Sequence, residues 1–225
     1  MKKVVIIGVG GFGREVAWLI ERINKIEPTW DILGFVDDNI DLLGSIVGGY
    51  QVLGNCEWLN VQTDEIYAVC AIASSKARKK VIQKLSGVKY ATIIDPKVEM
   101  SERVQLGEGC IICANTILTV DITIGTHVII NLDCTIGHDA VINDFVTLYP
   151  SVNISGNTNI GECVEMGTGC QIIQGLKIGD GTIVGAGSVV VKGLPKECTA
   201  VGSPARPIKY HKNYLNTSKI ISVIQ

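Results

Sequence analysis

The sequence predicts an α/β unit with a short parallel sheet, followed by an all-β unit that winds as a left-handed parallel β-helix. The second unit is predicted by a hexad: from Met100 to Val190, every sixth residue is aliphatic or Met. An unbroken period of six is typical of parallel β-helices, in which three hexads close one triangular coil. The first unit is predicted by residues 1–93, where short apolar runs alternate with stretches of helical spacing.

The first unit begins with a buried strand, because four apolar residues in a row follow Lys3. A glycine loop comes next, and then a helix from Arg14 to about Asn24 with apolar residues on one side. Ser74 and Ser75 are typical of a helix start and open a second, basic helix. The expected strands cover residues 3–7, 31–36, 65–73 and 88–94.

In the second unit, the hexad runs from residue 98 to residue 193 with no inserted loop. The aliphatic column should fill the inside of the prism. Glycine follows that column at several positions, among them Gly107 and Gly137, where we expect it to permit the tight corner. The predicted domains are residues 1–93, residues 94–209 and a C-terminal tail of residues 210–225.

Composition argues against several classes of protein. The formal net charge is −2, so nothing in the charge favours a nucleic-acid partner. No segment reaches the ~18 successive apolar residues of a membrane span, and we expect no membrane insertion. The cysteines form no CxxC pair, and Cys110, Cys134 and Cys170 fall at inward positions of the hexad. They therefore fit reduced core thiols in a cytoplasmic protein.

A glycine loop from Gly8 to Gly13 satisfies GxGxxG between a predicted strand and a predicted helix, as in Rossmann-like nucleotide-binding units. Backbone N–H groups at the start of the helix can bind phosphate, and a carboxylate after the next strand can accept from a ribose hydroxyl. The candidate substrate-binding residues are Gly8, Gly10, Gly11, Phe12, Gly13, Asp37 and Asp38.

Three interpretations of this loop stay open. An NAD-dependent dehydrogenase is one, but a dinucleotide needs two mononucleotide-binding halves, and residues 1–93 supply little more than one. A ligand with one nucleoside and two phosphates fits the length better. A tight turn without any ligand is the third interpretation.

The histidines point to a base rather than to a metal. His127 and His138 lie in the hexad tract, and His211 lies in the tail, where we expect it to be solvated. A zinc site on a β-helix would take three clustered histidines, so we expect no metal. His138 is the candidate general base, because it follows a glycine at a corner and precedes Asp139, which can orient an imidazole. A surface histidine without a function is the alternative.

The eighteen-residue coil should stack Val120, His138, Gly156 and Gln174 in one column, about 4.8 Å apart as in a parallel sheet. A glycine beside the histidine leaves backbone N–H groups open to a substrate, as an oxyanion hole requires. The candidate catalytic residues are therefore His138, Asp139 and Gly156.

These features together resemble the bacterial sugar acyltransferases of the sialic acid O-acetyltransferase and nucleotide-4-amino-sugar N-acetyltransferase group. The resemblance covers residues 1 to about 209. It is carried by the glycine loop, Asp37-Asp38, Gly137-His138-Asp139 and the stretch from Val201 to Arg206. It implies a homotrimer, with active sites between neighbouring β-helices and acetyl-CoA bound along the same groove.

By this resemblance, His138 would be the general base, Asp139 would orient it, and the Gly156 N–H would stabilise the oxyanion. Backbone groups near Thr168 and Ala186 would hold the pantetheine arm of acetyl-CoA. Relatives can carry a second histidine nine residues after the first, where this chain has Thr147, so a role for that histidine is not implied here.

The resemblance implies an acetyl-CoA-dependent N-acetyltransferase that acts on a nucleotide-linked 4-amino sugar in bacterial surface glycan biosynthesis, by direct transfer with a histidine base. O-acetylation of a sialic acid or a related sugar is the nearest alternative. An NAD-dependent dehydrogenase and a non-catalytic, ligand-binding trimer are the alternatives from other classes. The residues themselves do not name the sugar, the nucleoside or the acceptor atom.

Overall fold

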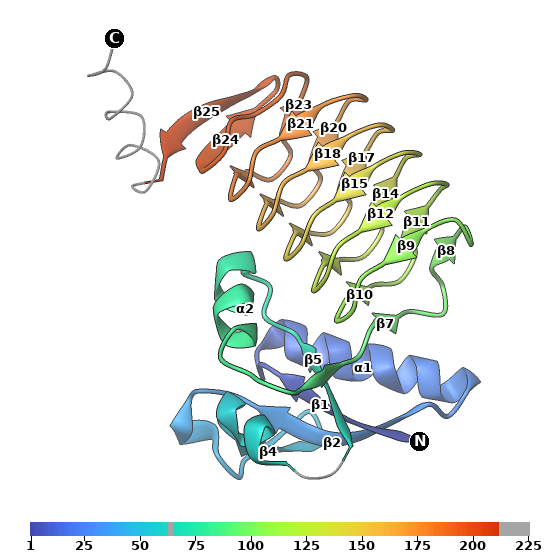
Figure 1. Ribbon diagram of the computed structural model, residues 1–225, viewed down its shortest axis with the longest axis vertical. Coiled ribbons are helices and arrows are strands. Elements are labelled where there is room, and N and C mark those ends of the chain that lie inside the picture. Colours follow the sequence, from blue (N-terminus) through green and yellow to red (C-terminus); the bar gives the residue numbers. More distant parts are fainter. Residues whose placement is uncertain (63–64, 212–225) are drawn as a thin grey trace.

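The structure is a computed structural model that describes residues 1–62 and 65–211. An α/β unit forms the N-terminal part, and a long β-helix rises from it (Figure 1). This architecture confirms the fold class expected from the sequence. The expected tail of residues 210–225 lies outside the described residues from residue 212 onward. No helix within the described ranges is both long enough and apolar enough to cross a membrane.

The N-terminal unit is built on one sheet in the order β3-β4-β2-β1-β5-β6. Its neighbouring strands are parallel, except for the β3–β4 pair. The stretch from Val4 to Ile7 in β1 is fully buried, which explains why it shows no alternation of polar and apolar residues. The strands are β1 (Lys2–Ile7), β2 (Trp30–Val36), β3 (Ile46–Val47), β4 (Tyr50–Gly54), β5 (Ile66–Cys70) and β6 (Lys89–Tyr90).

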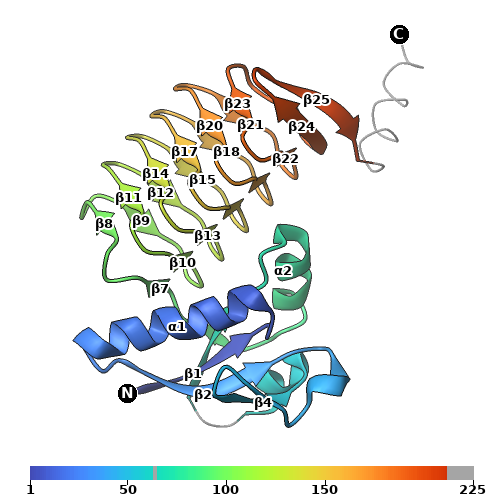
Figure 2. The same ribbon diagram turned by 180° about the vertical axis from the view of Figure 1, so that it is seen from behind.

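The described residues of this unit also form two α-helices and two 3-10 helices, η1 (Ile40–Leu42) and η2 (Cys56–Val61). Helix α1 (Gly11–Ile26) lies between the sheet and the first coils of the β-helix, as both views show (Figures 1 and 2). Its buried face carries Val16, Leu19 and Ile20 at helical spacing. Helix α2 (Ser75–Ile82) begins at the expected serines and lies against one side of the β-helix.

The β-helix consists mainly of two-residue strands in three parallel sheets. The sheet that contacts the N-terminal unit, here called the docking sheet, contains β7 (Ile93–Ile94), β10 (Ile111–Ile112), β13 (Ile129–Ile130), β16 (Thr147–Leu148), β19 (Glu165–Met166), β22 (Ile183–Val184), β24 (Cys198–Gly202) and the antiparallel β25 (Ala205–Tyr210). The second sheet contains β8 (Glu99–Met100), β11 (Ile117–Leu118), β14 (Thr135–Ile136), β17 (Asn153–Ile154), β20 (Gln171–Ile172) and β23 (Val189–Val190). The third sheet contains β9 (Gln105–Leu106), β12 (Thr123–Ile124), β15 (Val141–Ile142), β18 (Asn159–Ile160) and β21 (Lys177–Ile178).

Each coil stacks on the next with a register of eighteen residues. In the docking sheet, for example, Ile112 pairs with Ile130 and Ile130 with Leu148, and all three side chains point into the prism at 0% exposure. The same register holds in all three sheets, which confirms the hexad and the absence of a looped-out insertion. All eight cysteines of the chain are buried and unpaired.

The corners differ from the sequence-based expectation. The left-handed backbone conformation falls three residues after the inward aliphatic residue, as at Asn115 (φ 61°) and Asp139 (φ 58°). Asn and Asp tolerate this conformation better than other residues with side chains. The glycine directly after the aliphatic residue has a different role. A Cβ on Gly137 would lie 2.6 Å from the nitrogen of Gly156, so glycine there permits close approach of the next coil.

The single strand expected over residues 88–94 is two strands in different sheets. The first, β6, closes the N-terminal sheet, whereas β7 opens the docking sheet. The Ala91 N–H donates to the Ala68 oxygen at 2.9 Å, and the Ile93 N–H donates to the Cys110 oxygen at 2.8 Å. The chain therefore changes partner between Ala91 and Ile93, a change that the sequence of residues 88–94 does not reveal.

The N-terminal unit covers only the first part of the docking sheet. The outward side chains of Ile93, Ile111, Ile129 and Thr147 are at most 1% exposed. Farther along the same column, Ile183 is 37% exposed. Strands β7, β10 and β13 therefore carry isoleucine on both faces, as is typical of a doubly buried parallel strand.

A buried guanidinium joins the two units. Arg78 in α2 is 0% exposed, and its nitrogens donate only to uncharged oxygens. These acceptors are the carbonyl oxygens of Ile72, Ala73, His127, Phe145 and Val146 and the hydroxyl of Thr147, at 2.6 to 3.1 Å. Burial lowers the pKa of Arg78 to about 10, so the group is still charged at neutral pH. One side chain thus ties the end of β5 to two coils of the β-helix.

Arg78→Met should lower the free energy of unfolding by about 3 kcal/mol or more, because buried carbonyl oxygens lose their donors. Denaturant unfolding followed by circular dichroism measures this change. Lys80→Met, at an exposed position of the same helix, is the matched control and should stay within about 0.5 kcal/mol of the parent. A cost for Arg78→Met no larger than that of the control would contradict the joining role of Arg78.

Candidate active site and nucleotide-binding loop

His138 and Asp139 form a pair at the corner between β14 and β15. His138 Nδ1 lies 2.7 Å from Asp139 Oδ2, and the two side chains are 64% and 60% exposed. The left-handed conformation of Asp139 turns the chain at this corner. A carboxylate on Nδ1 leaves the other ring nitrogen, Nε2, as the one available to a substrate.

The structure stacks Val120, His138 and Gly156 on successive coils, as the eighteen-residue period predicts. The Asp139 N–H donates to the Val120 oxygen, and the Asn157 N–H donates to the His138 oxygen, at 3.2 and 2.7 Å. A Cβ on Gly156 would lie 2.6 Å from His138 Nε2, so the ring occupies the space that a side chain there would take. In the part of the chain that the structure describes, neither the Gly156 N–H nor His138 Nε2 has a hydrogen-bond partner.

Thr168 and Ala186 lie on a different corner from His138. Both fall between the docking sheet and the second sheet, whereas His138 falls between the second sheet and the third. The Gly187 N–H donates to the Thr168 oxygen at 2.8 Å, which stacks these two positions on each other. Within one chain, therefore, the expected base and the expected pantetheine contacts are not brought together.

Thr147 is a structural residue of the interface between the two units. Its hydroxyl donates to the Ala73 oxygen at 2.7 Å and accepts from Arg78 Nη2 at 2.9 Å, and the residue is 0% exposed. A threonine fits this position because one hydroxyl can donate and accept at once. The residue that stands in place of a second histidine is thus sealed beneath the N-terminal unit.

The other two histidines are also structural. The His127 ring stacks on Phe145 at 5.2 Å and meets the edge of Tyr90 at 4.5 Å, and burial lowers the pKa of His127 to about 4. His211, expected to be solvated, instead has Nδ1 at 3.2 Å from a Glu197 carboxylate oxygen and Nε2 at 3.1 Å from the Thr199 hydroxyl. Among the described residues, no three His, Cys, Asp or Glu side chains gather as metal ligands would.

The glycine loop separates into glycines that the fold needs and glycines that it does not need. Gly8 has φ of +98°, and a Cβ on Gly13 would collide with the Gly8 oxygen. Gly10 and Gly11 meet nothing closer than 4 Å at the Cβ position. The N-cap of α1 is Gly10, and no side chain caps the N–H groups of the first turn. Such a terminus can bind an anion such as phosphate.

The acidic pair lies beside this loop at the end of β2. Asp37 uses both oxygens on the backbone: Oδ2 accepts from the Val9 N–H at 3.0 Å, and Oδ1 accepts from the Asn39 N–H at 2.9 Å. Asp38 accepts from the Cys56 N–H at 3.0 Å, and this bond lowers the pKa of Asp38. Asp37 therefore shapes the loop, and Asp38 is the more available acceptor for a ligand.

A cavity of about 800 Å³ opens at the acidic pair and extends over η1 and η2. Among its lining residues are Asn39, Asn55 and Trp58, none of which the sequence analysis selected. A signal for the asparagines was present in the sequence, because each precedes a short helix and asparagine is a preferred N-cap.

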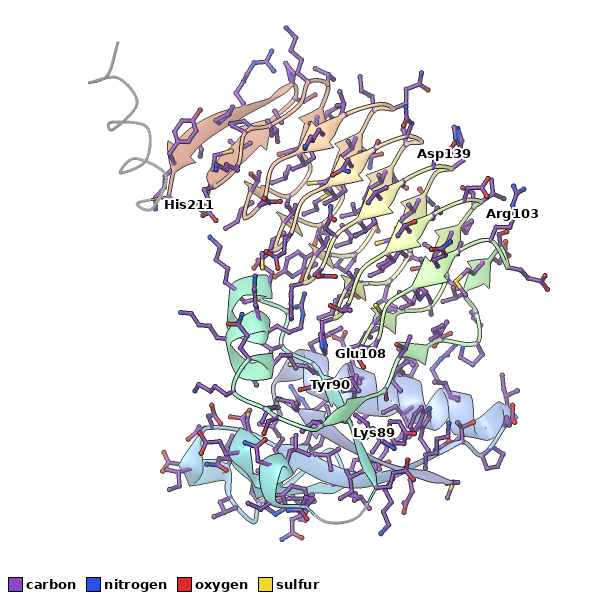
Figure 3. The ribbon with its side chains drawn as sticks, in the orientation of Figure 1. Lys89, Tyr90, Arg103, Glu108, Asp139 and His211 are labelled. Atoms are coloured by element: carbon purple, nitrogen blue, oxygen red, sulfur yellow. The ribbon has the colours of Figure 1, made fainter. Side chains whose placement is uncertain are left out.

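Within one chain, the glycine loop and His138 lie apart. The N-terminal unit packs on the docking sheet, and His138 is at the corner opposite that sheet. Figure 3 shows the neighbouring Asp139 at the outer edge of the β-helix, on the side away from α2. The glycine loop and the His138 of the same chain therefore lie on different faces of the molecule.

The fold and the site together define a class, the acyltransferases that join a nucleotide-binding unit to a hexapeptide β-helix. The family model of the PglD N-terminal domain matches residues 3–85. The chain is similar to the solved structure of WeeI from Acinetobacter baumannii AYE, with 33% identity and a TM-score of 0.83, over 92% of this chain and 100% of that one. No significant match was found among curated proteins.

Two further solved structures are similar to the chain. The acetyltransferase domain of PglB from Neisseria gonorrhoeae FA1090, in complex with acetyl coenzyme A, is 31% identical with a TM-score of 0.84, over 92% of this chain and 99% of that one. A histidine variant of perosamine N-acetyltransferase from Caulobacter crescentus, in complex with CoA and GDP-perosamine, is 30% identical with a TM-score of 0.84, over 93% and 98%. The chain therefore belongs to the hexapeptide-repeat sugar acetyltransferases with a PglD-type N-terminal domain.

Proposed function

We propose that this protein is an acetyl-CoA-dependent N-acetyltransferase that acts on a nucleotide-linked 4-amino sugar in bacterial surface glycan biosynthesis. The observation that carries the proposal is the His138–Asp139 pair beside the unpaired N–H of Gly156. That set offers a base and an oxyanion donor, which are the two groups that acyl transfer from a thioester needs. The complexes of PglB with acetyl coenzyme A and of the Caulobacter enzyme with CoA and GDP-perosamine support the same chemistry.

In the proposed reaction, the sugar amine attacks the thioester carbon while His138 Nε2 accepts a proton from the nitrogen. Asp139, on Nδ1, stabilises the imidazolium that forms. The Gly156 N–H donates to the oxyanion of the tetrahedral intermediate. The C–S bond then breaks, and the proton held by His138 passes to the leaving thiolate. The transfer is direct and needs no covalent enzyme intermediate.

The two units divide the substrates in this proposal. Residues 1–93 hold the nucleotide, with the first turn of α1 and the open Gly10 and Gly11 on the diphosphate. Residues 94–209 hold acetyl-CoA, with exposed backbone near Thr168 and Ala186 on the pantetheine arm. A cytoplasmic location, where both substrates are made, completes the proposal.

The proposal includes a homotrimer with each active site between two copies. Its support is that Thr168 and Ala186 lie on one corner of the prism and His138 on another. One copy would supply the base, and its neighbour would supply the corner that holds acetyl-CoA. The N-terminal unit would likewise present its sugar to a neighbouring β-helix.

A thiol-release assay with acetyl-CoA and a panel of nucleotide amino sugars tests the proposed activity. Release of CoA with a 4-amino sugar, and none with its 4-hydroxy counterpart, is the expected result. Release with a sialic acid instead would show O-acetylation. No release with any member of the panel would contradict the proposal.

His138→Ala should lower kcat by about 10²–10⁴-fold with acetyl-CoA binding unchanged, because a positioned general base contributes that much. Asp139→Asn should lower kcat by a smaller factor, since Asp139 acts through the imidazole. Asp121→Asn changes the carboxylate at the equivalent corner one coil earlier and should leave kcat unchanged. Steady-state kinetics measures all three variants, and near-parental turnover of His138→Ala would overturn the mechanism.

Gly10→Val should abolish nucleotide-sugar binding and leave acetyl-CoA binding intact, because the side chain would fill the space beside the first turn of α1. The fold should survive at a cost of about 1 kcal/mol, since Val is a poor N-cap. Calorimetric titration with each ligand measures the split. Gly13→Ala is the contrasting variant, whose Cβ collides with Gly8 and should destabilise the whole unit. Equal loss of both ligands in folded Gly10→Val would refute the division of substrates.

Light scattering at micromolar concentration should give a mass of about three times the 24.1 kDa of one chain. The physical reason is that a complete site needs two corners that one chain holds apart. A monomeric mass that persists in the presence of acetyl-CoA would contradict the shared site.

A further inference from the structure

A carboxylate of the β-helix caps a helix of the N-terminal unit. Helix α2 begins at Ser75, and the side chain of its N-cap residue, Ser74, makes no hydrogen bond to the helix. Instead, Glu165 Oε1 accepts from the Ser75 N–H at 2.8 Å and lies 2.8 Å from the Ser75 hydroxyl. A negative charge is favourable at a helix N-terminus. One oxygen of Glu165 therefore has a structural role.

The second carboxylate oxygen of Glu165 is used much less. Among the described residues, Oε2 has one hydrogen-bond partner, the Tyr149 hydroxyl at 3.4 Å. A hydrogen bond between two oxygens is normally about 2.5–3.0 Å long, so this contact is a weak one. Tyr149 and Glu165 are both half-buried and therefore remain accessible. Both groups can accordingly take a ligand as a further partner.

The pair offers one donor and one acceptor side by side. Burial and the neighbouring charge of Glu165 raise the pKa of Tyr149, so the phenol keeps its proton and can donate. A carboxylate can only accept. One hydroxyl group placed between them could accept from Tyr149 Oη and donate to Glu165 Oε2, because two oxygens 3.4 Å apart can both lie within hydrogen-bond distance of a third. Ether and carbonyl oxygens only accept and an ammonium group only donates, so none of these satisfies both groups.

The pair lies close to the glycine loop of the same chain. A Cβ on Gly8 would lie 3.3 Å from Ile72 Cγ1, so the loop packs against the residues that follow β5. Ser75, which contacts Glu165, is three residues after Ile72, and three residues of extended chain span at most ~11 Å. A ligand with its diphosphate on the glycine loop can therefore reach Glu165 with the group attached to that diphosphate.

The pair also adjoins the corner to which the proposed function assigns acetyl-CoA. Tyr149 directly follows β16 and begins the corner between the docking sheet and the second sheet. The Gly169 N–H donates to the oxygen of Pro150, the residue after Tyr149, at 2.9 Å, which stacks Pro150 next to Thr168. The pair is therefore flanked by the glycine loop on one side and by the corner of Thr168 on the other. In a nucleotide-sugar substrate, the sugar ring is the part that joins the diphosphate to the acceptor amine.

We propose that Tyr149 and Glu165 bind the ring hydroxyl next to the acceptor amine, and so select 4-amino sugars that keep their 3-hydroxyl. The inference rests on the proposed function, because it concerns the sugar of that substrate. One chain would hold both the diphosphate and the sugar ring, and the amine would face the base of a neighbouring copy. A sugar without this hydroxyl would leave a donor and an acceptor unpaired, at a cost in affinity.

Calorimetric titration of the intact protein tests the inference without any turnover. The probes are GDP-, UDP- and dTDP-linked 4-amino-4,6-dideoxyhexoses, each with a 3-hydroxyl and as the 3-deoxy compound. The 3-hydroxy compound should bind at least about tenfold more tightly than its 3-deoxy counterpart. Equal affinities would overturn the inference and leave the proposed acetyl transfer to its own thiol-release assay. If no probe binds, the inference fails together with the nucleotide part of the proposed function.

Tyr149→Phe removes the donor and keeps the ring. The preference for the 3-hydroxy compound should fall to about threefold or less, with the affinities for the 3-deoxy compound and for acetyl-CoA unchanged. Tyr50→Phe is the matched control, because the Tyr50 hydroxyl also lies on a carboxylate oxygen, Glu21 Oε1, at 3.0 Å. This control should keep the full preference. An unchanged preference in folded Tyr149→Phe, or an equal loss in Tyr50→Phe, would show that Tyr149 does not bind the hydroxyl.

Glu165→Gln separates ligand binding from the structural role of this residue. The amide keeps one oxygen for the Ser75 N–H but places an NH₂ group where the second acceptor was. The preference for the 3-hydroxy compound should fall here as well, because that NH₂ group cannot accept from the sugar. Denaturant unfolding followed by circular dichroism records any loss of stability separately. A folded Glu165→Gln protein that is less stable but keeps the full preference would show that Glu165 only caps α2, and would overturn the inference.

Discussion

The eighteen-residue coil is the constraint on which the rest of the structure depends. Each coil hydrogen-bonds to the next in all three sheets, so an insertion of one residue would shift every inward side chain out of the prism. The same register places His138 directly over Gly156 and leaves that backbone N–H open. The catalytic proposal is therefore a consequence of how coils stack, and it needs no special loop.

The stacked coils of the β-helix also provide the surface on which the N-terminal unit packs. The N-terminal unit packs on buried isoleucines of the docking sheet. Arg78 connects the two units by donating to carbonyl oxygens of both. A guanidinium can do this because its five N–H groups fan out in one plane. Within the described residues no carboxylate hydrogen-bonds to it, so the carbonyl dipoles and the more distant charge of Glu165 offset part of the desolvation. This interface sets the orientation of the glycine loop relative to the β-helix.

In the proposed trimer, that orientation leaves part of each site to a neighbouring copy. The glycine loop and the cavity lie at the carboxyl ends of strands in the N-terminal sheet, and helix α1 lies between that sheet and the docking sheet. His138 is at the corner between the second and third sheets, opposite the docking sheet. Thr168 and Ala186 are at the corner between the docking sheet and the second sheet. A threefold arrangement of β-helices would turn these separate corners toward one another. Oligomerisation would then be part of the chemistry and not only of stability.

The sequence by itself determined the β-helix, its register, the column of His138 and Gly156, and the glycine loop, because each depends on local spacing that repeats along the chain. Tertiary structure alone decided the rest. It divided residues 88–94 between two sheets, buried Thr147 beside Arg78 and gave His211 two hydrogen-bond partners. It also made Asn39 and Asn55 cap two short helices, where each amide oxygen accepts from a backbone N–H group. Contacts between residues far apart in the chain leave no periodic trace in the sequence.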